Sequence, residues 1–160
     1  KGTDRAPDVF DLGQAVALAN TDMFAPYKVE KFDTIPAGLK EATGLYVGDY
    51  GGYMSIGYDS KKVPDVTSVD DLTKADYKGK VALNGDPTQA GAAFNGVVMV
   101  ALAKGGSADD IQPGIDFFGE LKKAGNFLPV DPTDATVQSG QTPLVIDWDY
   151  LNAANTAKIP

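Results

Sequence analysis

Three adjacent side chains near the end of the sequence have the most chemical potential: Trp148, Asp149 and Tyr150, which follow an apolar segment ending at Asp147. Carboxylates beside aromatic rings suit an amine or another cation, which is held by charge and by the face of a ring. A structural interpretation is also open, in which the tryptophan packs in the core and both aspartates are solvated or cap the following helix. If the segment continues as a strand, Asp147 and Asp149 share one face and Trp148 lies on the other, so not all of these side chains point into one pocket.

A second group of polar residues, Asp86, Thr88 and Gln89, precedes the clearest helical pattern of the sequence. The first turn of a helix has free backbone N–H groups and the positive end of the helix dipole, which favour an anion or a polar oxygen. The local sequence favours a different role, because Asp86 or Thr88 would be an ordinary cap for that helix.

Two other segments lie where a ligand or a hinge is expected. Residues 11–14 join a predicted strand to a predicted helix, which is where ligands lie in open α/β sheets. The segment from Asp49 to Tyr53 contains Gly51 and Gly52, and glycine permits unusual backbone angles and the close approach of another group. This bend is either a hinge between lobes or a bulged strand. A G-x-G-x-x-G phosphate-binding motif is absent from the sequence.

The composition argues against most enzyme chemistry. The sequence contains no Cys and no His, which removes disulfides, thiolate metal sites, the Cys nucleophile and the Ser-His-Asp relay. Acidic residues outnumber basic ones by 22 to 14, and the net charge of −8 repels nucleic acids and anionic membranes while tolerating a cationic solute. We therefore expect no catalytic residue, no metal, no cofactor and no nucleic-acid partner.

The length of 160 residues fits one ordinary domain with its own core. The longest apolar stretch, residues 97–103, is far below the roughly 20 residues that cross a bilayer, so we expect no membrane span. Residues 1–4 lack the apolar segment of a signal peptide, and the sequence stops directly after a helical pattern. We expect an exported protein in which the signal peptide has been removed and both ends are cut.

Alternating strand and helix patterns predict an α/β lobe of three layers with a mixed, largely parallel sheet. Strand patterns cover residues 7–13, two parts of 44–58, 80–84, 127–130 and 143–147. Helical patterns cover residues 14–20, 37–42, 68–72, 90–102, 107–111, 113–125, 134–139 and 150–159. Ser68 with Asp71 predicts a capped start for one of these helices.

Five segments, taken in their order along the chain, carry a family resemblance: Pro7-Asp8-Val9-Phe10, Leu45-Tyr46-Val47, Tyr77-Lys78-Gly79-Lys80-Val81-Ala82, Asp86-Pro87-Thr88 and Pro143-Leu144-Val145-Ile146-Asp147. In this order they resemble the type II periplasmic binding proteins, which are the solute receptors of ABC importers. The ferric-iron and polyamine (spermidine/putrescine) receptors look most similar. The resemblance covers nearly the whole chain.

The resemblance implies a fragment of a two-lobed protein in which the lobes close over a ligand. Residues 1–44 would be a remnant of lobe one, residues 45–58 the crossover or hinge, and residues 59–160 lobe two. Exposed sheet edges of such a fragment would allow it to dimerise.

The resemblance also implies ligand-binding residues. Lobe one would contribute Gly13 and Gln14, and the hinge Asp49 and Tyr50. Lobe two would contribute Asp86, Thr88, Gln89, Trp148, Asp149 and Tyr150. Ferric receptors place two adjacent tyrosines at the last of these positions, whereas here Asp149 precedes a single tyrosine. This departure argues against direct ferric coordination and favours an amine, although sulfonate, phosphonate and carboxylate ligands occur on the same scaffold.

The expected function is therefore that of a solute-binding component of an ABC transporter, in the periplasm or attached to the cell surface. It would capture a small polar, polyamine-like solute, and its closed form would be presented to a membrane permease. Three alternatives stay open. The first is the effector-sensing domain of a transcription regulator, which shares the fold, and the second is a receptor for ferric iron or an organic anion. The third is an enzyme that uses aspartate carboxylates, which the lack of His, Cys and a metal motif disfavours.

Overall fold

The computed structural model describes residues 5–159, so the expectations about the two ends of the chain lie outside the described residues. It divides into two compact units, Lys1–Gly51 and Gly52–Pro160. Each unit is described by itself.

The first unit is mostly loop, held by short helical turns around one buried aromatic ring. Its helix α1 spans Gln14–Ala19, as predicted. The ring of Phe32 is buried, and the amino groups of Lys28 and Lys40 lie 5.0 and 4.5 Å from its centre. Turns of 3-10 helix lie at Thr21–Met23, Phe32–Thr34 and Ala37–Leu39.

The strand predicted at residues 7–13 is wrong. These residues form no strand, and Val9 is 85% exposed. A strand needs a neighbour that pairs with its N–H and C=O groups, and the described part of this unit holds only a single bridge, between Lys40 and Val47. For the same reason the first strand predicted in residues 44–58 is reduced to that bridge.

The second unit is built on a mixed sheet of three strands in the order β1-β3-β2. β1 (Met54–Tyr58) is antiparallel to β3 (Leu144–Trp148), with Ile56 opposite Ile146, and β2 (Val81–Leu83) is parallel to β3. The middle strand β3 is buried along most of its length, which explains its continuous apolar sequence. The predicted α/β class with a mixed sheet is confirmed.

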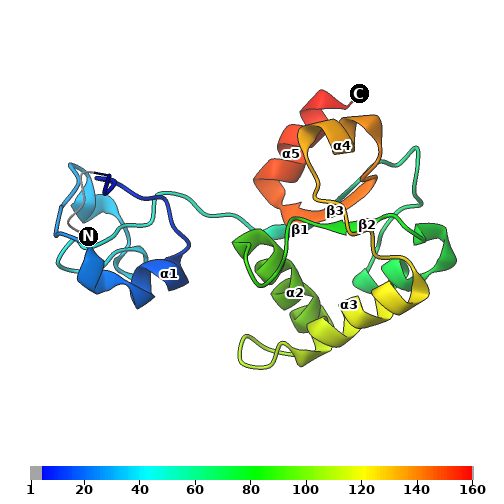
Figure 1. Ribbon diagram of the computed structural model, residues 1–160, viewed down its shortest axis with the longest axis horizontal. Helices are drawn as coiled ribbons and strands as arrows, with labels where there is room; N and C mark the ends of the chain where they lie inside the picture. Colours follow the sequence, from blue (N-terminus) through cyan, green and yellow to red (C-terminus); the bar gives the residue numbers. More distant parts are fainter. Residues whose placement is uncertain (1–4, 160) are drawn as a thin grey trace. The chain divides into compact units, whose positions relative to one another are not determined.

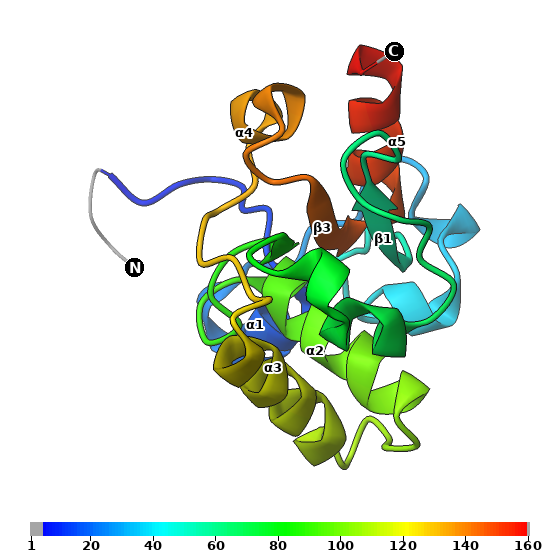
Figure 2. The same cartoon turned by 90° about the vertical axis from the view of Figure 1, so that its right-hand side faces the viewer.

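Helices cover both faces of this sheet and give three layers (Figure 1). On one side α2 (Gly91–Ala103) packs on the sheet and α3 (Gln112–Ala124) packs against α2. On the other side lie α4 (Asp134–Ser139) and α5 (Asp149–Lys158). Figure 2 shows α2 and α3 on one side and α4 and α5 on the other from a second direction.

Two glycines set the spacing of the layers. A Cβ placed on Gly96 of α2 would lie 2.6 Å from Leu83 Cδ1 and 3.1 Å from Ile146 Cγ2. A Cβ on Gly114 of α3 would lie closer than 3.0 Å to the carbonyl oxygen of Val97. The missing side chains therefore allow α2 to approach the sheet and α3 to approach α2.

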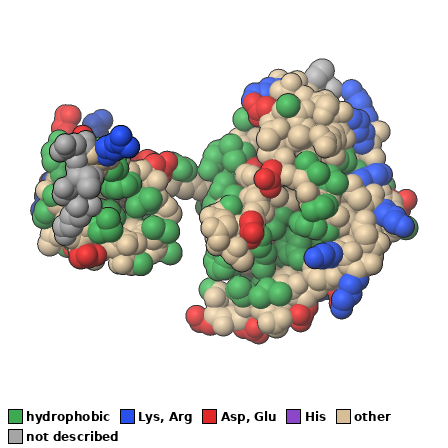
Figure 3. Space-filling model, in the orientation of Figure 1, with side chains coloured by type: hydrophobic (Ala, Val, Ile, Leu, Met, Phe, Trp, Pro, Cys, Tyr) green, Lys and Arg blue, Asp and Glu red, His purple; other side chains and the backbone are tan. Residues whose placement is uncertain are grey.

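The helix α2 has no charged residue. Its Phe94 and Leu102 are exposed, and Figure 3 shows hydrophobic side chains gathered over this part of the second unit. Within residues 5–159, no helix combines the length and apolar character required to cross a bilayer.

A capped 3-10 helix at Val69–Thr73 confirms the start predicted at Ser68 and Asp71. The Asp71 carboxylate accepts hydrogen bonds from Thr67 and Ser68 and lies 2.5 Å from the Lys74 amino group. The bond from Lys74, followed by those from Thr67 and Ser68, holds the pKa of Asp71 well below its ordinary value. A second 3-10 turn follows at Ala75–Tyr77.

Three other elements have a different form in the structure from the one predicted. The helical turn predicted at 107–111 is a tight turn bridged between Ser107 and Asp110, because the serine hydroxyl accepts from the backbone N–H of Asp110. The strand predicted at 127–130 is a single parallel bridge from Phe127 to Val81. The helix predicted at 37–42 is one 3-10 turn.

Candidate functional site

The candidate site of the second unit lies at one edge of its sheet, where β2 and β3 end. Because these strands are parallel, their carboxyl ends meet at the same edge, and α2 and α5 begin there. The Asn84 amide donates to Asp147 Oδ1 over 2.8 Å and ties the two strand ends together. This edge therefore brings the polar residues around 84–91 to the same end of the sheet as those around 147–150.

Asp147 belongs to the framework of this edge. Its side chain is 5% exposed, and Oδ1 accepts from both the Asn84 amide and the backbone N–H of Trp148, each over 2.8 Å. The condition for Asp147 and Asp149 to share one strand face is not met, because β3 ends at Trp148 and Asp149 is the first residue of α5.

Two aromatic rings lie at this edge of the sheet. The rings of Trp148 and Tyr150 are nearly parallel, with centroids 6.3 Å apart and an interplanar angle of 10°. Tyr150 is 41% exposed and Trp148 is half-buried. Trp148 is therefore not a fully buried core residue, and part of its surface stays open next to Asp149 in the chain. Such a pair can contact a flat or cationic group on a ring face.

Asp149 makes contacts that the sequence did not indicate. Its Oδ1 accepts from the backbone N–H of Tyr53 over 3.0 Å and of Tyr150 over 2.9 Å. Its own N–H donates to the Tyr53 carbonyl over 2.8 Å. Asp149 thus joins the start of α5 to the segment that leads into β1.

Asp86 and Thr88 form a turn before α2. Asp86 Oδ1 accepts from the backbone N–H of Thr88 over 2.8 Å and from its hydroxyl over 2.7 Å, and these bonds lower the pKa of Asp86. The predicted capping of α2 by either residue is wrong, because the N-cap is Ala90 and no side chain caps it. The Gln89 amide donates to the Thr88 hydroxyl over 3.3 Å, so the three predicted residues form one exposed polar group.

The remaining predicted site residues belong to the first unit. The carbonyl of Gly13 accepts from the first turn of α1, which begins at Gln14. Asp49 Oδ1 accepts from the backbone N–H of Tyr50 over 3.1 Å, and the Tyr50 hydroxyl donates to Asp11 over 3.3 Å. The structure thereby brings Tyr50 to the segment before α1.

Sequence reasoning missed two residues that border the aromatic pair. Tyr53 is 82% exposed and bonds to Asp149, and Gly52 lies against the ring of Tyr150. The glycine-rich bend was recognised as a feature, but no local pattern indicates that it meets residues almost 100 positions later. Within residues 5–159 no group of three or more acidic side chains is arranged to hold a metal ion.

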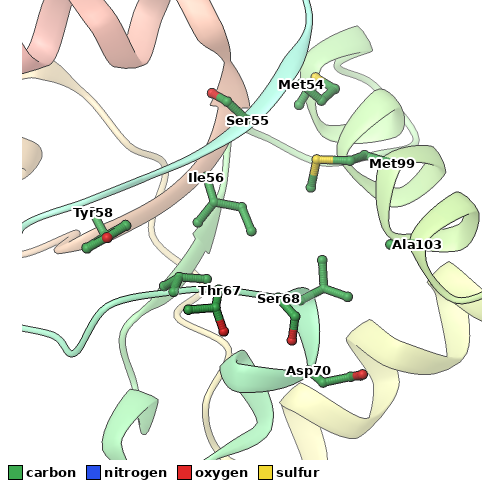
Figure 4. A pocket seen from close by; sticks show the side chains of 11 residues that line it. Met54, Ser55, Ile56, Tyr58, Thr67, Ser68, Asp70, Met99 and Ala103 are labelled. Carbon is green, nitrogen blue, oxygen red and sulfur yellow. The ribbon is translucent and has the colours of Figure 1, made fainter.

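Two cavities of the second unit lie away from this edge. One of about 470 Å³ lies between β1, α2 and the 3-10 helix at Val69–Thr73, where Ile56 and Met99 point toward each other (Figure 4). Its lining is mainly apolar but includes polar residues, among which Thr67 is engaged with Asp71. The other, of about 260 Å³, lies between α5, α4 and the turn after β1. Neither contains the predicted ligand residues.

Comparisons with known proteins agree with this architecture. A family model described as bacterial extracellular solute-binding protein matches residues 7–159. A search of the curated proteins finds no significant match.

Three solved structures illustrate the similarity. AfuA from Actinobacillus pleuropneumoniae, a periplasmic binding protein with fructose-6-phosphate bound, has a TM-score of 0.66 at 17% identity over 84% of this chain and 44% of its own. The spermidine/putrescine substrate-binding protein PotD from Streptococcus pneumoniae has 0.57 at 15% identity, covering 89% and 46%. Iron-bound HitA from Pseudomonas aeruginosa has 0.54 at 19% identity, covering 90% and 46%. The chain therefore spans less than half the length of these proteins and shares their fold.

Proposed function

This chain belongs to the bacterial extracellular solute-binding proteins, and we propose that the protein containing it captures a small polar solute between two lobes for an ABC importer. Residues 1–44 would be part of lobe one, residues 45–58 the crossover, and residues 59–160 lobe two. The membrane permease of the importer would be the protein partner, and the periplasm or the cell surface the location.

The observation that carries the proposal is the partly exposed Trp148–Tyr150 pair beside Asp149 at the carboxyl end of β3. Ligands of open α/β sheets lie at such an edge. An aromatic pair and a carboxylate can bind a solute without making or breaking a covalent bond, and the sequence contains no His or Cys. Asp86, Thr88 and Gln89 at the start of α2 would add hydrogen-bonding groups from the same edge.

For the class of solute, we propose an amine. A cation would contact the face of Trp148 or Tyr150 and gain from the carboxylate of Asp149. The net charge of −8 favours the approach of a cation. PotD is named for spermidine and putrescine. Of the two adjacent tyrosines that ferric receptors carry, only Tyr150 would remain in this chain, and Asp149 precedes it.

An organic anion is the main competitor. AfuA holds fructose-6-phosphate, and the first turn of α2 in this chain has neither a side-chain cap nor an acidic residue. An anion would bind there through backbone N–H groups, and not on the aromatic pair. Substitutions in the aromatic pair should therefore weaken the binding of an amine, whereas changes at the first turn of α2 should weaken the binding of an anion.

A thermal-shift screen of the full-length protein tests the proposal. The probes are putrescine, spermidine, ferric citrate and fructose-6-phosphate, because a ligand at 100 times its Kd stabilises the folded state by about 2.7 kcal/mol. We expect Tm to rise with a polyamine. Stabilisation by fructose-6-phosphate alone would overturn the amine class, and stabilisation by none of a broader solute set would overturn the receptor function.

Variants then locate the site. Trp148→Ala should remove most of the polyamine response, because it deletes one ring of the pair. Tyr58→Ala is the matched control, since Tyr58 is a 37% exposed aromatic residue at the opposite end of β1. Equal loss in both variants would remove Trp148 from the site.

A further inference from the structure

We infer that Asp149 and Gly52 clamp the segment from Asp49 to Tyr53, which we call the linker, to the candidate site. The pivot of the two-lobed protein would then lie at Gly51 and not within β1. This inference rests on the proposed function, because a pivot has a role only if two lobes close over a solute. The clamp itself is a property of the 160-residue chain and can be tested without a solute.

The first part of the clamp is a reciprocal pair of hydrogen bonds. The N–H of Asp149 donates to the Tyr53 carbonyl over 2.8 Å, and the N–H of Tyr53 donates to Asp149 Oδ1 over 3.0 Å. The β1–β3 ladder reaches only to Met54 opposite Trp148. Because Asp149 begins a helix, its side chain supplies the acceptor for Tyr53, and the pairing extends one residue beyond the sheet.

The second part of the clamp is the close packing of Gly52. A Cβ at Gly52 would lie 2.8 Å from Asp149 Oδ1 and 2.8 Å from two ring atoms of Tyr150. The same ring stacks on Trp148. The linker backbone therefore lies directly against the Tyr150 ring of the aromatic pair that we assign to the solute.

The close packing of the linker against Asp149 and Tyr150 ends immediately before Gly52. A Cβ at Gly51 would meet no atom within 4 Å, and the boundary between the two units falls between Gly51 and Gly52. Neither glycine has a positive φ angle, so an alanine is compatible with the backbone at both positions. Motion about the linker is thus confined to the residues before Gly52, and a shift of Tyr150 is transmitted to the start of the linker.

Amide hydrogen exchange and 15N relaxation of the 160-residue chain test the clamp. In the wild-type chain we expect the Tyr53 amide to be protected and fast backbone motion to end at Gly51. Asp149→Ala removes the acceptor and should speed exchange at Tyr53 by roughly tenfold. Asp149→Asn keeps an acceptor oxygen and should restore protection.

The two glycines provide a matched pair of variants. Gly52→Ala should speed exchange at Tyr53 and extend the mobile linker toward β1, whereas Gly51→Ala should leave both unchanged. Exchange at Ile146, in the middle of β3, reports whether the fold is intact, and it should stay slow in every variant.

Three results would overturn the clamp: an unprotected Tyr53 amide in the wild-type chain, equal exchange in Asp149→Ala and wild type, or equal effects of the two glycine variants. Failure of the proposed function has a different signature. It would leave the Tyr53 exchange pattern as described and abolish only the solute response of the full-length protein.

Discussion

Replacement of Gly114 by alanine should destabilise the second unit, although alanine is the better helix former. In a solvent-exposed helix interior, Gly→Ala stabilises by about 1 kcal/mol. At Gly114 the new Cβ would lie 3.0 Å from the backbone nitrogen of Ala101, 3.1 Å from its Cβ, and closer still to the carbonyl oxygen of Val97. These are mainly backbone atoms of α2, so the helices must separate.

The magnitude follows from two opposing contributions. Overpacking of a tight contact costs about 1–3 kcal/mol, and backbone neighbours that cannot rotate away place this site in the upper part of that range. Subtracting the gain in helix propensity leaves a net loss of about 1–2 kcal/mol. Gly119 lies in the same helix with no atom within 4 Å of its Cβ position, so Gly119→Ala should gain roughly 0.5–1 kcal/mol.

Urea unfolding followed by tryptophan fluorescence measures both changes. Trp148 is the single tryptophan of the chain and lies in the second unit, so it reports on the fold that contains α3. With an m-value of about 2 kcal/mol/M, the midpoints of the two variants should differ by about 1 M. If both variants are more stable than wild type by similar amounts, the close approach of α3 to α2 is refuted.

Two further changes test the packing and the electrostatics of the second unit. Asn126→Ala should destabilise by about 2–4 kcal/mol, because its buried amide donates to the carbonyls of Leu72 and Lys74 over 2.7 and 2.8 Å. The control in urea unfolding is Asn95→Ala, since the half-buried Asn95 bonds only within its own helix, to the Gly91 carbonyl. Equal midpoints would contradict the role of Asn126. Asp71 has a folded-state pKa below its unfolded value, so its contribution to stability is complete above about pH 4 and is lost as the pH falls below that value. Urea midpoints should therefore fall more steeply from pH 5 to pH 2 in wild type than in Asp71→Asn, and parallel curves would show that the carboxylate is not responsible.

Local sequence patterns predicted most of the second unit. Strand and helix patterns located β2, β3, α2, α3, α4 and α5. The strands β2 and β3 are buried apolar runs, and α2 and α3 carry buried apolar residues at helical spacing. The capped 3-10 helix after Ser68 could also be predicted, because Ser68 and Asp71, the two partners of the capping contact, lie three residues apart. At residues 7–13 the strand pattern has no neighbouring strand to pair with, and the strand predicted there was wrong.

The types of residue available for a site, and the absence of His and Cys, were determined by the sequence alone. The acidic and aromatic group at residues 148–150 could also be identified from the sequence, because those residues are adjacent in the chain. What each side chain does was decided by tertiary contacts. Asp147 became part of the framework through Asn84, and Asp149 became an anchor for Tyr53, at separations of 63 and 96 residues. No local pattern encodes such pairings, because they form only when β1, β2 and β3 assemble into one sheet.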